Sequence, residues 1–243
     1  MTIPVQAADQ KYTPVTLQTL SDALFKIGVL RYSDSLAVDE YIRIHHCGLY
    51  EQYGGDDIAW TRLREAQARE LELMTPTFND YVEIQGTIML GAYDFASSRF
   101  EIDPESALKN TGIIDVVEYD GGSYEPCVGD QYKLFVPRAH PLHLTTRISN
   151  PLTLTSLPVN RQAGDQMVKI INSRVQNRVT RSALLVMRVH LLGPDPLSGS
   201  TEPSSLTVTG DLDEILVYDG PERNVLLYTE KFTKPEDKKK SDH

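Results

Sequence analysis

Cysteine is scarce in this sequence, and long apolar runs are absent. The 243 residues include two cysteines, Cys47 and Cys127, which lie far apart and form no CxxC pair. That spacing excludes the usual redox and zinc-ribbon motifs. The two side chains could form a disulfide in an oxidising compartment or remain thiols, and the sequence leaves both alternatives open. No stretch approaches the roughly 18 apolar residues of a membrane helix, so we expect no membrane span.

Basic residues are also in deficit. Lys and Arg together number 24 against 34 Asp and Glu, which gives a formal net charge of −10. Nucleic-acid binding draws its affinity from cations that neutralise phosphates, so this balance argues against a nucleic-acid partner. Hydrophobic residues make up 40% of the chain and charged residues 24%, which are ordinary values for a folded globular protein. We therefore expect a soluble, acidic, folded chain.

The common signatures of catalysis and cofactor binding are missing. The sequence contains no GxGxxG, no Walker loop, no HExxH, no GxSxG elbow and no EF-hand loop. We therefore expect no cofactor and assign no catalytic residue. A non-enzymatic role is favoured over an enzyme whose site carries no known signature.

What the sequence does contain is, first, a helical N-terminal third. Leu17, Leu20 and Leu24 recur at helical spacing, and Gly28 lies just past them. Two further helices are predicted: one begins after Ser33-Asp34-Ser35 and ends at Gly54-Gly55, and the other is capped by Asp56 or Asp57 and ends at Thr75-Pro76.

From Tyr81 onward the apolar period changes from helical spacing to two, which predicts strands. One helix, capped by Asn160, interrupts them. The fold class that follows is α+β, with N-terminal helices packed on a mostly antiparallel sheet or meander with one inserted helix. Further strands are expected near 100–102, 113–119, 132–136, 142–148, 152–157, 179–192, 206–218 and 225–229. The expected organisation is a flexible N-terminus (1–12), a single α+β domain (13–232, helical in 16–74 and strand-rich in 80–232) and a disordered polar tail (233–243).

A Tyr-Asp dipeptide ends three of these predicted strands. Tyr93-Asp94, Tyr119-Asp120 and Tyr218-Asp219 each precede a turn. Asp side chains accept hydrogen bonds from turn N–H groups, so we interpret the dipeptides as strand ends rather than as catalytic pairs.

Positive charge is concentrated in one segment. From Arg161 to His190 six basic residues face a single acid, Asp165, so the segment carries a formal +5 within a chain of −10. Arginine suits bidentate recognition of carboxylate or phosphate, which predicts docking of an acidic protein partner or a small anionic ligand. Alternatively, the arginines pair internally with the chain's own carboxylates. The predicted binding residues are Arg174, Arg178, Arg181 and Arg188.

Histidine and cysteine supply the alternative hypothesis, a metal-assisted hydrolase with an unrecognised site. Its candidate ligands are His46, Cys127, His140 and His143. Their spacing is poor for a tetrahedral site, because adjacent helical residues point about 100° apart. His45 lies on an apolar stripe, where a hydrogen-bonded core histidine is expected. We assign no metal site.

Two segments carry a family resemblance. The stretch YIRIHHCGLYEQYGGDDIAWTRLR (41–64) and the segment Leu-Gly-Ala-Tyr-Asp-Phe (90–95) resemble the uncharacterised bacterial family known as domain-of-unknown-function family 4852. The resemblance implies a protein of similar length that is often exported, and it implies no activity. Val5-Gln6-Ala7 also fits the end of a trimmed signal peptide. We expect a periplasmic or secreted protein, with a cytoplasmic one as the alternative. The hypothesis is a non-enzymatic binding or structural module of the bacterial envelope or secretome. The sequence does not indicate its oligomeric state.

Overall fold

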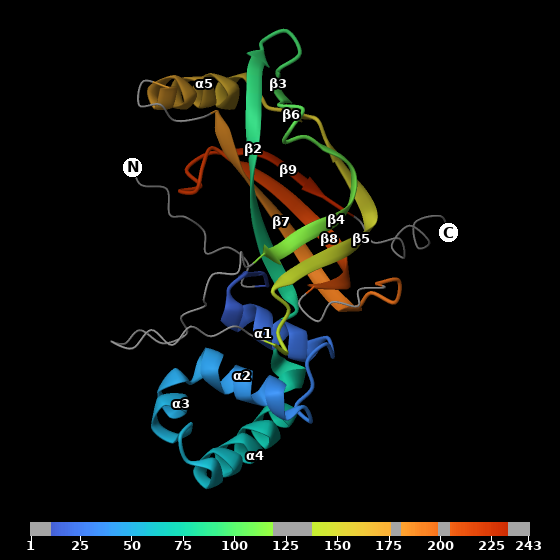
Figure 1. Cartoon of the computed structure of the whole chain (residues 1–243). Helices are drawn as coiled ribbons and strands as arrows, with labels where there is room; N and C mark the ends of the chain where they lie inside the picture. The colour runs from blue at the N-terminus through green and yellow to red at the C-terminus, as the bar shows by residue number, and fades with distance from the viewer. Residues whose placement is uncertain (1–10, 119–137, 176–180, 199–204, 233–243) are drawn as a thin grey trace. The chain divides into compact units, whose positions relative to one another are not determined.

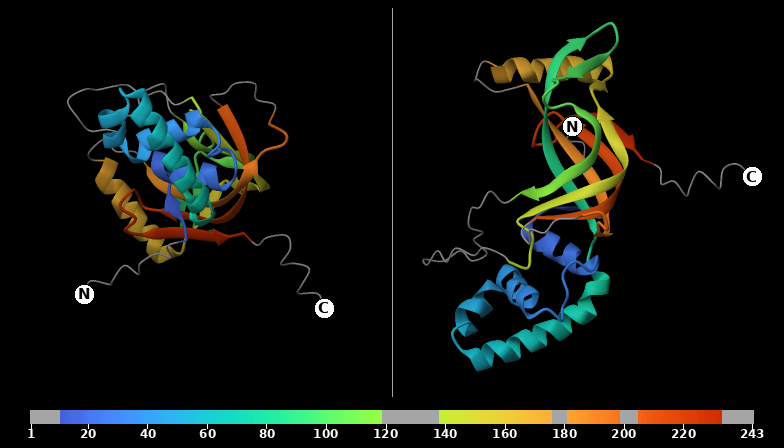
Figure 2. Two further views of the ribbon diagram at one scale, coloured as in Figure 1. Left: turned by 90° about the horizontal axis from the view of Figure 1, so that it is seen from below. Right: turned by 45° about the vertical axis from the view of Figure 1, so that its right-hand side comes forward.

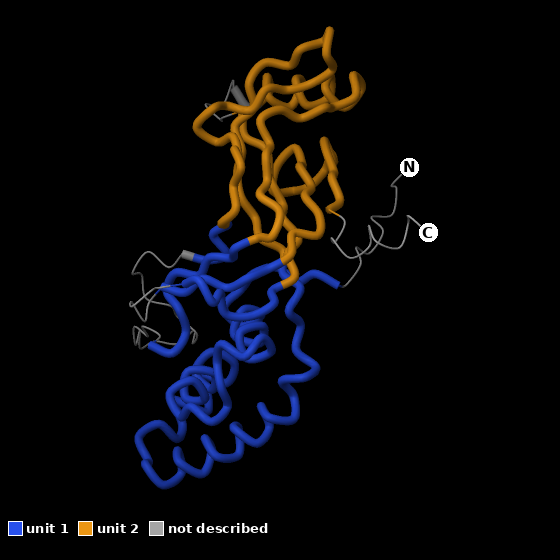
Figure 3. Tube along the Cα trace, turned by 90° about the vertical axis from the view of Figure 1, so that its right-hand side faces the viewer, with its two compact units in different colours: residues 1–82, 114–147, 191–210 blue, residues 83–113, 148–190, 211–243 orange. Residues whose placement is uncertain are grey.

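The structure is a computed structural model that describes residues 11–118, 138–175, 181–198 and 205–232 (Figure 1, with two further views in Figure 2). The chain divides into two compact units (Figure 3). The first unit comprises residues 1–82, 114–147 and 191–210, and the second comprises residues 83–113, 148–190 and 211–243. No helix in the described part of the chain is long and apolar enough to cross a membrane.

The first unit contains the predicted N-terminal helices. Three of them begin at a side chain that accepts a backbone N–H: Thr16 accepts from Thr19, Asp34 from Leu36, and Asp56 from Ile58 and Ala59. Such caps satisfy donors that a helix leaves unpaired at its first turn, and those at Asp34 and Asp56 confirm the predicted starts of two helices. The helices are α1 (Leu17–Lys26), α2 (Ser35–His45), α3 (Cys47–Tyr53) and α4 (Asp57–Met74), followed by the 3-10 helix η1 (Thr75–Thr77).

The second predicted helix is in fact two helices, so that prediction is wrong in one respect. His46 has φ −133° and ψ 48°, outside the helical region, and it separates α2 from α3. No Gly or Pro stands at this position to mark the division. Gly28, in contrast, ends α1 as expected, with a left-handed φ of 77° that favours glycine.

The strands form a nine-stranded sheet within the described residues. Their order is β4-β5-β8-β7-β2-β3-β6, with β1 paired to β2 and β9 paired to β8. The pairs β2–β3, β3–β6 and β8–β9 are antiparallel, and the fold is α+β with a mostly antiparallel sheet, as predicted. The strands are β1 (Thr13–Pro14), β2 (Tyr81–Asp94), β3 (Arg99–Ile102), β4 (Leu108–Glu118), β5 (His143–Leu154), β6 (Ser156–Pro158), β7 (Ser182–Pro194), β8 (Ser205–Tyr218) and β9 (Leu226–Lys231).

Three strand predictions differ from the structure. The segments expected at 142–148 and 152–157 are the long strand β5 and the short strand β6, and β4 begins five residues earlier than the 113–119 prediction. The strand expected at 132–136 lies outside the described residues. Period-two alternation marks half-buried strands, and it places their ends less well than their centres.

The Tyr-Asp dipeptides end strands as predicted at the two described positions. The Asp94 carboxylate accepts the N–H of Ala96 at 2.8 Å after β2, and Asp219 accepts the N–H of Val225 at 3.0 Å after β8. The third dipeptide, 119–120, lies outside the described residues.

The inserted helix α5 (Arg161–Val175) belongs to the second unit and lies beside the end of β2, close to β3 and β6 (Figures 1 and 2). Its predicted cap is present, because Asn160 accepts the N–H of Ala163 at 3.0 Å. The Tyr93 ring lies directly against Gly164, and its hydroxyl donates to the Val159 carbonyl at 2.9 Å. These contacts fix α5 on the β2–β3 hairpin.

Candidate functional site

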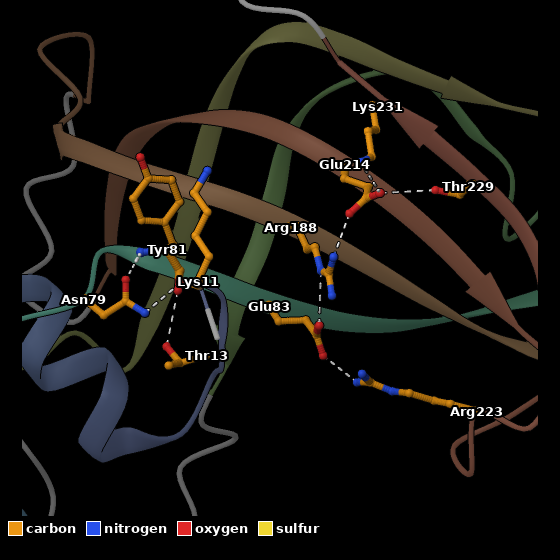
Figure 4. Close-up of polar contacts among 10 residues, drawn as sticks. All are labelled: Lys11, Thr13, Asn79, Tyr81, Glu83, Arg188, Glu214, Arg223, Thr229 and Lys231. Carbon is orange, nitrogen blue, oxygen red and sulfur yellow. Dashed lines mark hydrogen bonds and ion pairs between the residues drawn. The ribbon is translucent and has the colours of Figure 1, made fainter. Parts of the chain in front are cut away.

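Arg188, one of the predicted anion-binding residues, lies between two carboxylates on neighbouring strands (Figure 4). Its Nη1 donates to Glu214 Oε2 at 2.7 Å, and its Nε lies 3.5 Å from Glu83 Oε2. Glu83 is on β2, Arg188 on β7 and Glu214 on β8, which are adjacent in the sheet. The three side chains are at most 15% exposed. The Arg188 guanidinium therefore binds partners within its own sheet.

Further charges extend this row at both ends. Arg223 donates to Glu83 Oε1 at 2.5 Å, and Lys231 Nζ lies 3.9 Å from Glu214 Oε1. Positive and negative groups thus alternate along the row, so each carboxylate has a cation on either side (Figure 4). We call Glu83, Arg188, Glu214, Arg223 and Lys231 the charge row.

The carboxylates of the charge row stabilise the charged form of Arg188. Burial opposes the charged form of Arg188, but the hydrogen bond to Glu214 and the charges of Glu214 and Glu83 outweigh it. The pKa of the guanidinium is therefore held above its usual range. Such a network leaves little of its central arginine for an outside anion.

The other predicted arginines are not gathered around Arg188 in the described structure. Arg181 donates from Nε to the Leu90 carbonyl at 2.9 Å and from Nη2 to the Gly91 carbonyl, which ties it to β2. The side chain of Arg174, near the end of α5, and the whole of Arg178 lie outside the described residues. The contacts of Arg188 match the alternative stated for the basic segment, in which its arginines pair with the chain's own carboxylates.

The candidate metal ligands are separated in the part of the chain that the structure describes. His143 lies 3.2 Å from the exposed Asp115, His46 stands between α2 and α3, and His140 contacts Glu40. Cys127 lies outside the described residues. Among the residues described, no three His, Cys, Asp or Glu side chains are grouped so that they could hold a metal ion.

His140 instead takes part in a buried network with α1 and α2. Its Nδ1 lies 2.8 Å from Glu40 Oε2, and its Nε2 lies 2.9 Å from Ser21 Oγ. The Glu40 carboxylate also accepts the backbone N–H groups of Arg138, Ala139 and His140 at 2.5 to 3.1 Å. Burial alone would raise the pKa of Glu40, but the bonds from His140 and these N–H groups outweigh it and hold the pKa below its usual range.

The order serine, histidine, carboxylate is that of a nucleophilic triad, and its surroundings decide what it can do. Ser21 lies inside α1, where backbone N–H groups are committed to helical hydrogen bonds and cannot stabilise an oxyanion. Ser21, Glu40 and His140 are each at most 2% exposed, so the hydroxyl is shielded from substrates. The network therefore attaches residues 138–140 to α1 and α2.

A second polar group lies beside this network, between the same helices. The Asp22 carboxylate accepts a hydrogen bond from the Tyr41 hydroxyl, and its Oδ1 lies 3.4 Å from His45 Nε2. Burial raises the pKa of Asp22 to about 6, partly offset by the Tyr41 bond. Burial, with the neighbouring His46 and His140, lowers the pKa of His45 to about 4. Perturbed pairs of this kind are typical of functional sites and also of polar helix interfaces.

Sequence reasoning missed Ser21, Asp22 and Glu40, although one signal for two of them was present. Ser21 stands on the apolar stripe formed by Leu17 and Leu24, and Glu40 is three or four residues from the buried Ala37 and Ile44. A polar residue at such a position must find a buried partner. His45, predicted as a core histidine, stacks on the Tyr41 ring at 4.0 Å and is mostly buried.

Cys47, at the start of α3, is disulfide-bonded. The sequence holds one other cysteine, Cys127, which lies outside the described residues. Of the two alternatives left open by the sequence, the disulfide is therefore the one found at Cys47.

Comparison with known proteins identifies the family. The sequence model described as a domain of unknown function (DUF4852) matches residues 34–169, more than half of the chain. The chain belongs to the DUF4852 family. The DUF4852 match confirms the resemblance found in the sequence, and it includes Glu40 and His140 but ends before Arg174. No curated protein and no solved structure matches this DUF4852 chain.

Proposed function

We propose that the protein is an exported, non-enzymatic binding or structural module of the bacterial envelope or secretome. The disulfide at Cys47 carries the proposal of export. Disulfides persist in the periplasm and outside the cell, whereas cytosolic thiols are kept reduced. A periplasmic or secreted location is therefore favoured over the cytoplasmic alternative.

The proposal of a non-enzymatic role is supported by the contacts of the reactive side chains, which bind one another. Ser21, Glu40 and His140 bind one another inside the first unit, and the charge row is paired inside the second. Groups engaged in this way stabilise the fold and present no activated nucleophile or base to a substrate.

The binding part rests on the basic segment that ends α5 and continues into β7. We place contact with an acidic protein partner or a small anionic ligand there, through Arg174 and Arg178, because Arg181 and Arg188 are engaged by β2 and by the charge row. Arginine clusters recognise carboxylates and phosphates through bidentate hydrogen bonds. Because Arg181 and Arg188 hold β2 and the charge row, the binding test uses substitutions at Arg174 and Arg178.

Export is tested by expressing the native gene in a Gram-negative host and separating the periplasm from the cytoplasm. Maleimide–polyethylene glycol labelling before and after reduction then reports the thiols. We expect periplasmic protein whose cysteines react only after reduction. Cytoplasmic protein with reactive thiols would reject the proposed compartment.

Anion binding is tested by calorimetry of the purified chain with poly-L-glutamate and, separately, with inorganic phosphate. Reversal of both charges in Arg174→Glu/Arg178→Glu should weaken binding of the preferred probe by about tenfold or more. Arg31→Glu/Arg62→Glu makes the same change in net charge at exposed residues outside the basic segment, and it should bind like the wild type. Absence of binding, or equal loss in both variants, would exclude this surface.

A further inference from the structure

The carboxylate of Glu40 is the single acceptor for a cluster of donors from a distant segment. Oε1 accepts the N–H of Arg138 at 2.5 Å and that of Ala139 at 3.1 Å. Oε2 accepts the N–H groups of Ala139 and His140 at 3.0 Å each and faces His140 Nδ1 at 2.8 Å. Only an ionised carboxylate offers lone pairs to all of these donors. The attachment of residues 138–140 to α2 therefore depends on the charge of one side chain.

Ser21 makes the same attachment tolerant of the histidine's own protonation. With neutral His140, the Ser21 hydroxyl donates to Nε2. With protonated His140, Nε2 donates to the hydroxyl oxygen, since a serine hydroxyl can play either role. Nδ1 donates to Glu40 in both states. The same hydrogen bonds can thus form with either form of the His140 ring.

Within the described part of the chain, the other ionisable groups nearby make no hydrogen bond to the Glu40 carboxylate. Asp22 on α1 contacts Tyr41 and His45 on α2, His46 and His140 both lower the pKa of His45, and Glu70 on α4 acts on Tyr41. The Arg138 side chain is exposed. Proton uptake that removes the hydrogen bonds of residues 138–140 must therefore occur on Glu40 itself.

We propose that Glu40 is an acid-sensitive latch that holds residues 138–140 on α1 and α2 and releases them when its carboxylate is protonated. A protonated carboxyl group turns one acceptor oxygen into a donor that faces backbone N–H groups. The segment then loses acceptors for buried N–H groups, which is costly enough to open it. The latch adds a local, pH-dependent opening to a protein whose sheet stays folded.

The pH window follows from the sign of the shift. The pKa of Glu40 in the folded protein is held below the ordinary 4.5, so the latch is stable above that pH and is lost as the pH falls through the lower value in the folded protein. An exported protein is exposed to such acid when its surroundings acidify.

Amide hydrogen exchange of the full chain, followed by nuclear magnetic resonance, tests the latch. As the pH is lowered in steps from about 7 to the onset of global unfolding, after correction for intrinsic rates, protection of Arg138, Ala139 and His140 should fall by about tenfold or more before the sheet unfolds. The amide of Val186 in the buried strand β7 should keep its protection. Loss at all four amides in step would show global unfolding and overturn the proposal, as would unchanged protection at acid pH.

Two variants sharpen the experiment. Glu40→Gln should show the open state at neutral pH, because its amide nitrogen cannot accept the backbone N–H groups. Asp39→Asn, which removes the adjacent carboxylate that pairs with Arg64 at 2.5 Å, should behave like the wild type at the latch. Retained protection in a folded Glu40→Gln protein would refute the latch. If that variant does not fold, the wild-type titration decides alone.

Discussion

Asp22 and His45 are two neighbouring side chains whose pKa values move in opposite senses on folding. The pKa of Asp22 is raised from 3.8 to about 6, so the folded protein keeps this proton over a pH range where the unfolded chain has lost it. The pKa of His45 is lowered from 6.5 to about 4, so between these pH values the unfolded chain holds a proton that the folded protein lacks. Between about pH 4 and pH 6 the two effects oppose each other, and the pair contributes little net pH dependence.

Removing either partner should expose the effect of the other. In Asp22→Asn, the remaining His45 makes the free energy of unfolding fall as the pH drops from about 6.5 to 4, relative to wild type. In His45→Gln, the remaining Asp22 makes it fall as the pH rises from about 4 to 6. Urea denaturation at several pH values gives the slope of the free energy of unfolding against pH for each variant. Slopes of the same sign in the two variants would contradict the pairing.

Adjacent threonines on β5 give a second residue-scale contrast. Thr146 is fully buried, and its hydroxyl has no hydrogen-bond partner among the described residues, whereas the Thr145 hydroxyl lies 2.9 Å from that of Thr207. Thr146→Val should stabilise the protein by about 1 kcal/mol, because it removes a buried polar group that is not satisfied. Thr145→Val should destabilise it by about 1 kcal/mol. Thermal denaturation compares the two, and destabilisation of equal size in both would show that Thr146 is satisfied after all.

At the scale of the element, local chemistry made the starts of helices predictable. Asp34, Asp56 and Asn160 cap α2, α4 and α5 through hydrogen bonds to residues two or three positions away, and such short-range geometry is encoded in short stretches of sequence. The break at His46 was not predictable in this way. Its backbone leaves the helical region without Gly or Pro, next to the disulfide-bonded Cys47. A tertiary constraint outweighs helical propensity there.

Two helical glycines should respond in opposite ways to the same substitution. A methyl group at Gly164 would lie 2.4 Å from Cζ of Tyr93, so Gly164→Ala must displace that ring and cost about 2 kcal/mol. A methyl group at Gly48 in α3 meets nothing within 4 Å, so Gly48→Ala should stabilise by about 0.5 to 1 kcal/mol. Chemical denaturation monitored by circular dichroism measures both. Stabilisation by Gly164→Ala would mean that α5 does not pack on Tyr93.

At the scale of the whole molecule, the decisive contacts join positions far apart in the sequence. Glu40 and His140 are 100 residues apart, and Glu83 and Arg223 are 140 apart. Periodicity predicted the strands that carry the charge row, and composition located the excess of arginine. Neither could show that β2, β7 and β8 are neighbours, which is what decides that Arg188 meets Glu83 and Glu214. The fold class was therefore predictable, and the partners of its buried charges were not.

Removal of Arg188 tests whether the charge row holds its strands together. Arg188→Met leaves Glu83 and Glu214, which are 7% and 12% exposed, without their central cation. Because Arg223 and Lys231 remain, the expected loss of about 3 kcal/mol is at the lower end for breaking a buried ion pair.

The control for that loss is the same substitution at an exposed arginine. A second comparison removes the charges of both carboxylates together with that of Arg188. Arg62→Met on the exposed surface of α4 should change stability by less than about 0.5 kcal/mol. Adding Glu83→Gln and Glu214→Gln to Arg188→Met should restore about half of the loss or more, because no uncompensated buried carboxylate remains. Urea denaturation of the four proteins measures these differences. If Arg188→Met costs no more than Arg62→Met, the strands are held by apolar packing, and the charge row adds no net stability.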